Sequence, residues 1–305
     1  MPIPTVEKIW MNGELVPWAE AKVHVLTHAL HYGSGVFEGI RCYKTVRGPA
    51  VFRLTDHLER LRRSAKIHYM ELPYSVDELA AATCALIRAN RLDACYVRPI
   101  VFRGYGEMGL YPLGAPVDCA IAVWPWGAYL GEEGIEHGIR AKVASIQSLD
   151  ANSITPAAKA CGQYLNSCLA KIEVTKAGYD EAVMLNRHGF VSQGSGENIF
   201  AVRGGRLCTP PLSDGVLEGI TRDTVMRIAA SLDIEVREQS LTRSDLYVAD
   251  EAFFSGTAAE VVPIREIDDH RIGEPGPVTR QIQRRFRDII EGRDGEFGHF
   301  LEYVS

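Results

Sequence analysis

The sequence predicts an α+β fold of two α/β-type domains whose sheets are rich in antiparallel strands. Its 305 residues, 46% hydrophobic and 24% charged, are enough for two domains of ordinary size. The Asn-Gly pair at residues 12–13 lies between two apolar runs, which is the strongest short signal for a β-hairpin. Later strand and helix patterns are mixed without strict alternation, which favours antiparallel pairing.

Residues 1–123 are expected to form a small N-terminal domain. Thr55 has a hydroxyl that can cap a helix running to residue 67. Ser75 and Glu78 have the spacing of a capping box, so a second helix is expected to begin there and run to residue 90. The strands expected after the hairpin at 9–16 are 39–43, 51–54, 95–102 and 119–123.

Residues 124–136 are expected to be an interdomain loop, because the Trp, Pro, Gly and Tyr residues at 124–131 fit neither helix nor strand. Three large aromatic rings in one loop are ordinarily covered by a pocket or a partner subunit. Residues 137–305 then form the large C-terminal domain. Its expected strands are 139–145, 180–186, 190–193, 198–202, 207–209, 234–238 and 251–254, and its expected helices are 162–177, one from Thr221 and one at 278–290.

The composition excludes several classes of partner. The formal net charge is −6, from 33 basic and 39 acidic residues, and no basic stripe is present to bind nucleic acid. No apolar run reaches the roughly 20 residues that cross a bilayer, and the first residues lack a basic-then-apolar signal pattern. We therefore expect a cytoplasmic protein without nucleic-acid or membrane partners.

The seven cysteines do not point to a disulfide framework or a metal site. Their number is odd and none forms a Cys-x-x-Cys pair, so no zinc or other metal site is expected. Cys161 lies two residues from Lys159, but no histidine is close to it in the sequence to activate the thiol. We interpret the cysteines as reduced thiols that mostly pack in the core.

Lys159 is the first candidate for chemistry. It lies in the run NSITPAAKACGQY (152–164), whose small residues leave room beside its amine. A lysine amine becomes a nucleophile in a small, desolvated pocket. However, a lysine in such a run is more often exposed to solvent, so Lys159 needs support from the rest of the chain.

Two glycine-containing turns are candidates for anion binding. Residues 215–223 lead directly into a helix N-terminus, where amide donors and the helix dipole favour a phosphate. An ordinary N-cap at Thr221 is the alternative interpretation. Residues 255–259, SGTAA, form a second turn whose backbone amides can hold another anion.

Arg98 is the third candidate. The period of two in the strand at 95–102 places Tyr96 and Arg98 on one face. A buried arginine there needs an anion, although a structural pair with a nearby carboxylate is an equally good explanation. The lysine, the two turns and this arginine together resemble what a pyridoxal phosphate enzyme of amino acids needs.

The order of several long motifs makes the resemblance specific. The chain resembles the branched-chain amino acid aminotransferases of bacterial type, which are class IV, pyridoxal phosphate-dependent enzymes of fold type IV, the fold of D-amino acid aminotransferase. Tyr96, Arg98 and residues 127–131 are typical of the branched-chain subgroup. The motifs are YGSGVFEGIR (32–41), YVRP (96–99), WGAYLG (126–131), KACGQY (159–164), GSGENIF (194–200), LEGITR (217–222) and SGTAA (255–259).

This resemblance implies a cofactor site. A lysine placed like Lys159 carries the cofactor covalently and, once released, moves the proton of the substrate Cα. A tyrosine placed like Tyr164 bonds the phenolic oxygen of the cofactor. The residues implied to hold its phosphate are Arg60, Leu217, Gly219, Ile220, Thr221 and Thr257.

The resemblance also implies transamination of L-leucine, L-isoleucine and L-valine with 2-oxoglutarate. The α-carboxylate would bind Tyr96 and the amides of Thr257 and Ala258, and Arg98 would bind the γ-carboxylate of glutamate. In the family, residues placed like Tyr32 and Leu110 come from the neighbouring subunit, so a homodimer or a larger homo-oligomer, up to a hexamer, is expected. The other residues implied to line the site are Phe37, Gly39, Trp126 and Tyr129.

Gln193 departs from the family pattern, which has a glutamate that keeps the cofactor's ring nitrogen protonated. An amide can bond that nitrogen through either end but supplies no negative charge, so a weaker electron sink is expected. Gln193 therefore keeps other possibilities open. These are a D-amino acid aminotransferase, an (R)-selective amine transaminase, an aminodeoxychorismate lyase and a cofactor-binding protein without strong catalysis.

Overall fold

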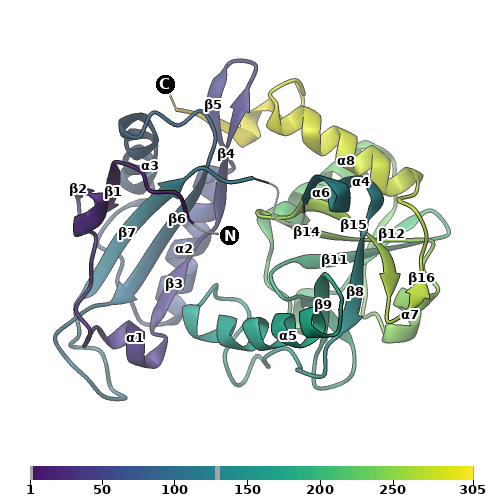
Figure 1. Cartoon of the computed structure of the whole chain (residues 1–305), viewed down its shortest axis with the longest axis horizontal. Helices are drawn as coiled ribbons and strands as arrows, with labels where there is room; N and C mark the ends of the chain where they lie inside the picture. Colours follow the sequence, from purple (N-terminus) through teal and green to yellow (C-terminus); the bar gives the residue numbers. More distant parts are fainter. Residues whose placement is uncertain (1–2, 128–130, 305) are drawn as a thin grey trace. The chain divides into compact units, whose positions relative to one another are not determined.

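The computed structural model describes residues 3–127 and 131–304, which divide into two compact units (Figure 1). Unit 1 comprises Met1–Trp126, Ala158–Gly162 and Ile289–Ser305, and unit 2 comprises Gly127–Ala157 and Gln163–Asp288. Two segments that we expected in the C-terminal domain therefore belong to unit 1. They do so because β17 (Leu301–Tyr303) pairs with β5 (Gly48–Phe52) and Ala160 forms a β-bridge with Val36. No local sequence pattern predicts either pairing, because the partners lie far apart in the chain.

Unit 1 is built on an eight-stranded sheet in which every pairing is antiparallel. The predicted hairpin is confirmed as β1 (Lys8–Met11) and β2 (Glu14–Pro17), with φ of 48° at Asn12 and 96° at Gly13. The strand order is β17–β5–β4–β6–β7–β1–β2, with β3 also on β6. The remaining strands are β3 (Gly35–Phe37), β4 (Ile40–Thr45), β6 (Cys95–Arg103) and β7 (Val117–Trp124).

Helices α2 (Leu54–Ile67) and α3 (Val76–Ala89) pack on this sheet and share one apolar core with it. The predicted capping box of Ser75 and Glu78 is confirmed at the start of α3. The prediction that Thr55 caps α2 is wrong, because Arg53 is the N-cap residue and the backbone N–H and hydroxyl of Thr55 donate to Glu302. A short helix, α1 (His28–Tyr32), precedes β3 and was not predicted.

Unit 2 is built on a nine-stranded sheet with the order β10–β9–β8–β15–β14–β11–β12–β13, and β16 pairs with β15. The predicted excess of antiparallel pairing is confirmed, although β8 is parallel to β9 and β15, and β12 is parallel to β13. The strands are β8 (Ile139–Val143), β9 (Glu181–Leu185), β10 (Val191–Gly194), β11 (Asn198–Arg203), β12 (Arg206–Thr209), β13 (Val236–Glu238), β14 (Glu251–Gly256), β15 (Glu260–Ile267) and β16 (His270–Arg271).

The helices of unit 2 correct one prediction. The expected loop at 124–136 contains a helix, because Ile135 packs against the core of unit 2 and the carbonyl of Glu136 accepts a hydrogen bond from Arg280. Within the described ranges, no helix is long and apolar enough to cross a membrane. The helices are α4 (Gly131–His137), α5 (Tyr164–Lys176), α6 (Ile220–Ser231), α7 (Arg243–Tyr247) and α8 (Pro277–Ile290), of which Figure 1 shows the order along the chain.

Candidate active site

The backbone of Lys159 is held on both sides by elements of unit 1. Its N–H donates to Ser64 Oγ of α2 at 3.1 Å, and its carbonyl accepts from Phe37 N–H at 3.0 Å. The half-buried side chain extends over the Phe37 ring, with Nζ 5.1 Å from the ring centroid. The predicted nucleophile is therefore anchored by a helix and a strand, which limits the positions that its amine can reach.

A buried carboxylate lies beside this lysine segment. Glu38 is fully buried and accepts from Arg60 Nε at 2.7 Å, from Arg60 Nη2 at 2.9 Å and from His57 Nδ1 at 2.7 Å. Although burial opposes ionisation, Arg60 and His57 hold the pKa of Glu38 well below its usual range. Two donors of Arg60, the expected phosphate ligand, thus bind a carboxylate of the protein itself and set the orientation of its guanidinium.

His57 makes the contribution of this cluster to stability depend on pH. Burial lowers the pKa of His57, and the opposing attraction to Glu38 does not restore it. A histidine whose folded pKa lies below the ordinary value of about 6.5 takes up its proton more readily in the unfolded chain. The contribution of His57 to stability is therefore present above pH 6.5 and falls as the pH drops below it, towards the folded pKa.

We predict that the free energy of unfolding decreases between pH 6.5 and pH 5, by at most about 1.4 kcal/mol per pH unit for this one proton. His57→Asn keeps an N–H that can bond Glu38 but cannot titrate, so its unfolding free energy should depend less on pH. Urea unfolding at several pH values measures both slopes, with the exposed His31→Gln as control. Equal slopes in the His57→Asn variant and the parent would contradict the prediction.

Arg98 lies among aromatic rings rather than beside a carboxylate. Its guanidinium carbon is 4.8 Å from the Phe37 ring centroid, 5.3 Å from that of Tyr96 and 5.8 Å from that of Trp124. Among the described residues it has no ion-pair partner, and its buried Nε has no hydrogen-bond acceptor. Within this part of the chain, Arg98 therefore does not form the structural pair with a carboxylate that the sequence left open as an alternative. A half-buried cation without a counter-ion fits an anionic ligand.

Indole donors lie next to Arg98. The Nε1 atoms of Trp124 and Trp126 are buried and have no partner among the described residues. Both rings contact Tyr96, each with a centroid distance of 5.2 Å. Together these groups give unit 1 an apolar surface that carries a few hydrogen-bond donors, which is the usual composition of a small-molecule site.

Gly39 determines where the Tyr96 hydroxyl lies. A Cβ at residue 39 would be 2.1 Å from Tyr96 Oη, so only glycine leaves space for this ring. We predict that Gly39→Ala lowers the free energy of unfolding by about 1–3 kcal/mol through overpacking. Adding Tyr96→Phe removes the hydroxyl and should restore part of the loss in urea unfolding. A Gly39→Ala protein as stable as the parent would show that the tyrosine moves at no cost.

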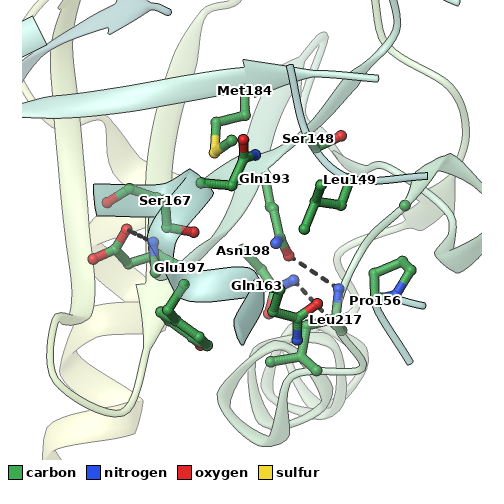
Figure 2. A pocket seen from close by; sticks show the side chains of 15 residues that line it. Ser148, Leu149, Pro156, Gln163, Ser167, Met184, Gln193, Glu197, Asn198 and Leu217 are labelled. Carbon is green, nitrogen blue, oxygen red and sulfur yellow. Dashed lines mark hydrogen bonds between the residues drawn. The ribbon is translucent and has the colours of Figure 1, made fainter. Parts of the chain in front are cut away.

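Unit 2 contains a pocket lined by Tyr164, Gln193 and Leu217 of the predicted site. The space between its lining residues is about 570 Å³, which includes open solvent. Figure 2 shows the amide of Gln193 turned to the backbone of Leu217, where its Oε1 accepts from Leu217 N–H at 3.0 Å. The NH2 group of Gln193 is thus the end left to bond a ligand.

The two turns that were predicted to bind anions both lie in unit 2. α6 begins at Ile220 after Gly219, an N-cap without a side-chain hydrogen bond, so the alternative interpretation of Thr221 as an N-cap is wrong. A Cβ at Gly219 would be 1.9 Å from Asn198 Oδ1, so only glycine fits at this position of the turn before α6. Thr257 and Ala258 lie in the turn between β14 and β15. Backbone amides at such turns suit a phosphate or a carboxylate.

The structure places the predicted substrate residues in different parts of the chain. In unit 1 the Phe37 ring lies under both Arg98 and Lys159. Tyr96 contacts Arg98, Trp126 and the backbone at Gly39. Tyr32 and Leu110 are exposed, and the Tyr32 ring stacks on His28, which binds the carbonyl of Gly109 next to Leu110. Tyr129 lies outside the described residues.

Sequence reasoning missed Glu38, His57, Ser64 and Trp124. A signal existed for α2, because His57, Arg60 and Ser64 occupy the helix positions i, i+3 and i+7, where a packed helix normally carries apolar residues.

The chain is similar to known proteins along most of its length. The model of the family "Amino-transferase class IV" matches residues 35–267. The branched-chain-amino-acid aminotransferase of Escherichia coli (strain K12) is 48% identical over 300 residues, 97% of each chain. A putative branched-chain-amino-acid aminotransferase of Methanocaldococcus jannaschii is 44% identical over 286 residues, 92% of this chain and 96% of that protein.

Solved structures give the same result. A crystal structure of the Escherichia coli branched-chain amino acid aminotransferase has a TM-score of 0.97 at 47% identity and covers 99% of this chain and 100% of that chain. The branched-chain aminotransferase of Thermoproteus uzoniensis with norvaline has a TM-score of 0.95 at 47% identity, with the same coverage. The chain belongs to the class IV aminotransferases.

Proposed function

We propose that this protein catalyses pyridoxal phosphate-dependent transamination of L-leucine, L-isoleucine and L-valine with 2-oxoglutarate. Its relatives at 48% identity bear the name branched-chain-amino-acid aminotransferase. Two solved structures of another enzyme of that name, at 43% and 44% identity, are of complexes with 4-methylvaleric acid and with N-(5'-phosphopyridoxyl)-L-glutamate. One compound is a branched aliphatic acid and the other carries glutamate, which correspond to the two kinds of substrate proposed here.

The observation that carries the proposal is that Arg98 lies among aromatic rings and has no counter-ion among the residues that the structure describes. A dual-specificity site must hold a branched aliphatic chain and then the charged chain of glutamate. The rings of Phe37, Tyr96 and Trp126 offer apolar contact to the first. The guanidinium of Arg98 offers a paired hydrogen bond to the γ-carboxylate of the second.

The residues present fit pyridoxal phosphate. The glycine turn before α6 suits its phosphate, and the resemblance implies that Arg60, whose orientation Glu38 fixes, would add a positive charge for this group. Tyr164 and the NH2 of Gln193 line the pocket that would receive its ring. When bound, this cofactor supplies the electron sink for the carbanion at the substrate Cα. Thr257 and Ala258 would hold the α-carboxylate with the Tyr96 hydroxyl.

Lys159 is the residue that we propose to move the proton. In each half-reaction its Nζ would carry the proton between the substrate Cα and the C4′ atom of the cofactor, as a base when it removes the proton and as an acid when it delivers it. The backbone bonds to Ser64 and Phe37 keep the amine in a defined position for both transfers.

Gln193 should limit the rate. Its Oε1 accepts from Leu217 N–H, so the NH2 group would donate to the ring nitrogen of the bound cofactor and would supply no negative charge to keep that nitrogen protonated. We predict that Gln193→Glu, which can still accept from Leu217, raises the single-turnover rate of the leucine half-reaction. Stopped-flow absorbance measures this rate, with the exposed Glu296→Gln as control. An unchanged or lower rate would show that the missing charge does not limit the reaction.

The test of the proposed function is spectroscopic. The visible absorbance of the loaded protein should shift with L-leucine and return with 2-oxoglutarate. A panel that includes D-amino acids and (R)-amines distinguishes the other class IV activities, and a response to these alone would replace our proposal. A colourless protein, or one whose colour no amino donor shifts, would leave only a non-catalytic homologue.

We also propose that the active form is a homodimer or a larger homo-oligomer and that it acts in the cytoplasm, where its substrates are made. Tyr32 and Leu110, which the family takes from the neighbouring subunit, are 45% and 92% exposed in the single chain. Their exposure leaves both side chains available to contact a second subunit. Light scattering should give at least twice the chain mass of 33.7 kDa, and a monomer that retains full activity would contradict the assembly.

A further inference from the structure

His28 is a buried histidine that the cluster around Lys159 does not use. It begins α1 and is only 2% exposed, whereas His31 on the same helix is exposed. A buried imidazole must have partners for both ring nitrogens or bear the cost of desolvation. Its partners come from segments on both sides of β3 in the sequence, and they connect two of the predicted substrate residues.

The ring contacts define one tautomer of His28. Nε2 lies 2.8 Å from the carbonyl oxygen of Gly109, which can only accept, so Nε2 bears the hydrogen. Nδ1 lies 2.6 Å from Ser34 Oγ and accepts from this hydroxyl in the neutral ring. Both nitrogens are satisfied at once, which locks the ring in a single orientation.

The same residue holds the loop that carries Leu110. The backbone N–H of His28 donates to the carbonyl of Gly104 at 3.1 Å, while its ring binds Gly109. Gly109 has a φ of 123°, so the chain turns there in a conformation that favours glycine, and Leu110 follows directly. His28 therefore fixes residues 104–109 at both ends.

Tyr32 rests on the other side of this arrangement. Its ring stacks on the His28 ring with a centroid distance of 4.5 Å and an interplanar angle of 28°. Tyr32 is at the end of α1, a helix of only five residues that has little stability of its own. The stack on a locked imidazole therefore supplies order that this short helix lacks.

We propose that His28 is a positioning residue that holds Tyr32 and the Leu110 loop in one fixed arrangement for substrate binding. This inference depends on the proposed function, in which both side chains line a substrate site. Ordering a loop before the ligand arrives removes that entropic cost from the binding step. Loss of the His28–Gly109 bond should therefore weaken substrate binding more than it slows the chemical step.

Two variants test the roles of the two ring nitrogens of His28 separately. In His28→Gln the amide nitrogen can take the place of Nε2 and keep the bond to Gly109, whereas in His28→Asn it can take only the place of Nδ1. His28→Asn should raise KM for leucine and 2-oxoglutarate about tenfold, the equivalent of one hydrogen bond, with kcat changed less. His28→Gln should stay close to the parent KM, as should the control His31→Gln.

A double-mutant cycle distinguishes positioning from a general loss of structure. If His28 acts through the loop, adding His28→Asn to a Leu110→Ala protein should raise KM by much less than it does in the parent. Equal, additive effects in the two backgrounds would overturn the proposal. So would a His28→Asn protein with the KM of the parent.

Hydrogen–deuterium exchange provides a second readout that does not need activity. Residues 104–110 should exchange faster in His28→Asn than in His28→Gln or His31→Gln, and exchange equal in all three would overturn the proposal. The parent is first tested for transamination of leucine. If the parent does not transaminate leucine, the proposed function is wrong, and the substrate role of His28 is wrong with it. This outcome is recognised from the parent alone, before any variant is tested.

Discussion

Replacing Lys159 with alanine should lower the rate of leucine transamination by a factor of about 10⁴ or more, because the variant loses both its nucleophile and its proton carrier. The fold should persist. The backbone N–H and carbonyl of residue 159, which bond Ser64 and Phe37, remain in the variant, and the half-buried side chain fills no core position. Single-turnover absorbance measures the rate and urea unfolding measures the stability.

The matched control is Lys176→Ala, at the exposed end of α5, which should keep the parent rate. Borohydride reduction of the loaded parent should attach the cofactor mass to the peptide that contains Lys159, and this adduct should be absent from the Lys159→Ala protein. A variant that retains a hundredth of the parent rate, or an adduct on another lysine, would show that the assignment of Lys159 is wrong.

Glu38→Gln should be the most destabilising of the substitutions considered, with an expected loss of about 3–5 kcal/mol in the free energy of unfolding. The amide has nearly the shape of the carboxylate but leaves the buried Arg60 without its counter-ion. Urea unfolding at pH 7 measures the loss. The control is Glu59→Gln on the same helix, whose partly exposed pair with Arg62 should contribute less than about 1 kcal/mol.

The pH dependence of this loss follows from the ionisation of Glu38. Its folded pKa lies far below the ordinary carboxyl value of about 4.3, so its stabilisation is complete above that value and is lost as the pH falls towards the folded pKa. The difference between the parent and Glu38→Gln should therefore narrow below pH 4. A loss under 1 kcal/mol at pH 7 would mean that the cluster contributes little to the fold.

Local sequence patterns predicted much of the secondary structure because the determinants are themselves local. Asn12 and Gly13 adopt the positive φ values that a two-residue hairpin needs, and Ser75 with Glu78 forms both bonds of its capping box. In each case the residues concerned lie within four positions of one another. Thr55 failed as a cap because a residue far away in the sequence, Glu302, binds it instead.

The candidate site was predictable only in part. Lys159, Arg98 and the turn before α6 were found because their residue types and neighbours indicate chemistry. Glu38 and His57 were not, because an acid in the connection between two strands and a histidine on a helix look like surface residues until the two segments pack together. Trp124 was missed for the same reason, since only the register of β7 with β6 places it opposite Tyr96.

The sequence by itself determined the family, the order of most elements and the residue types that perform the chemistry, because motifs, turn residues and capping pairs act over short distances. Only the tertiary structure decided which of these residues meet. It joined the Lys159 segment to unit 1 through Val36 and enclosed Glu38 between His57 and Arg60. It also placed Arg98 among rings, with no carboxylate paired to it in the part of the chain that the structure describes. Burial and ionic pairing depend on groups far apart in the chain, and no local pattern specifies them.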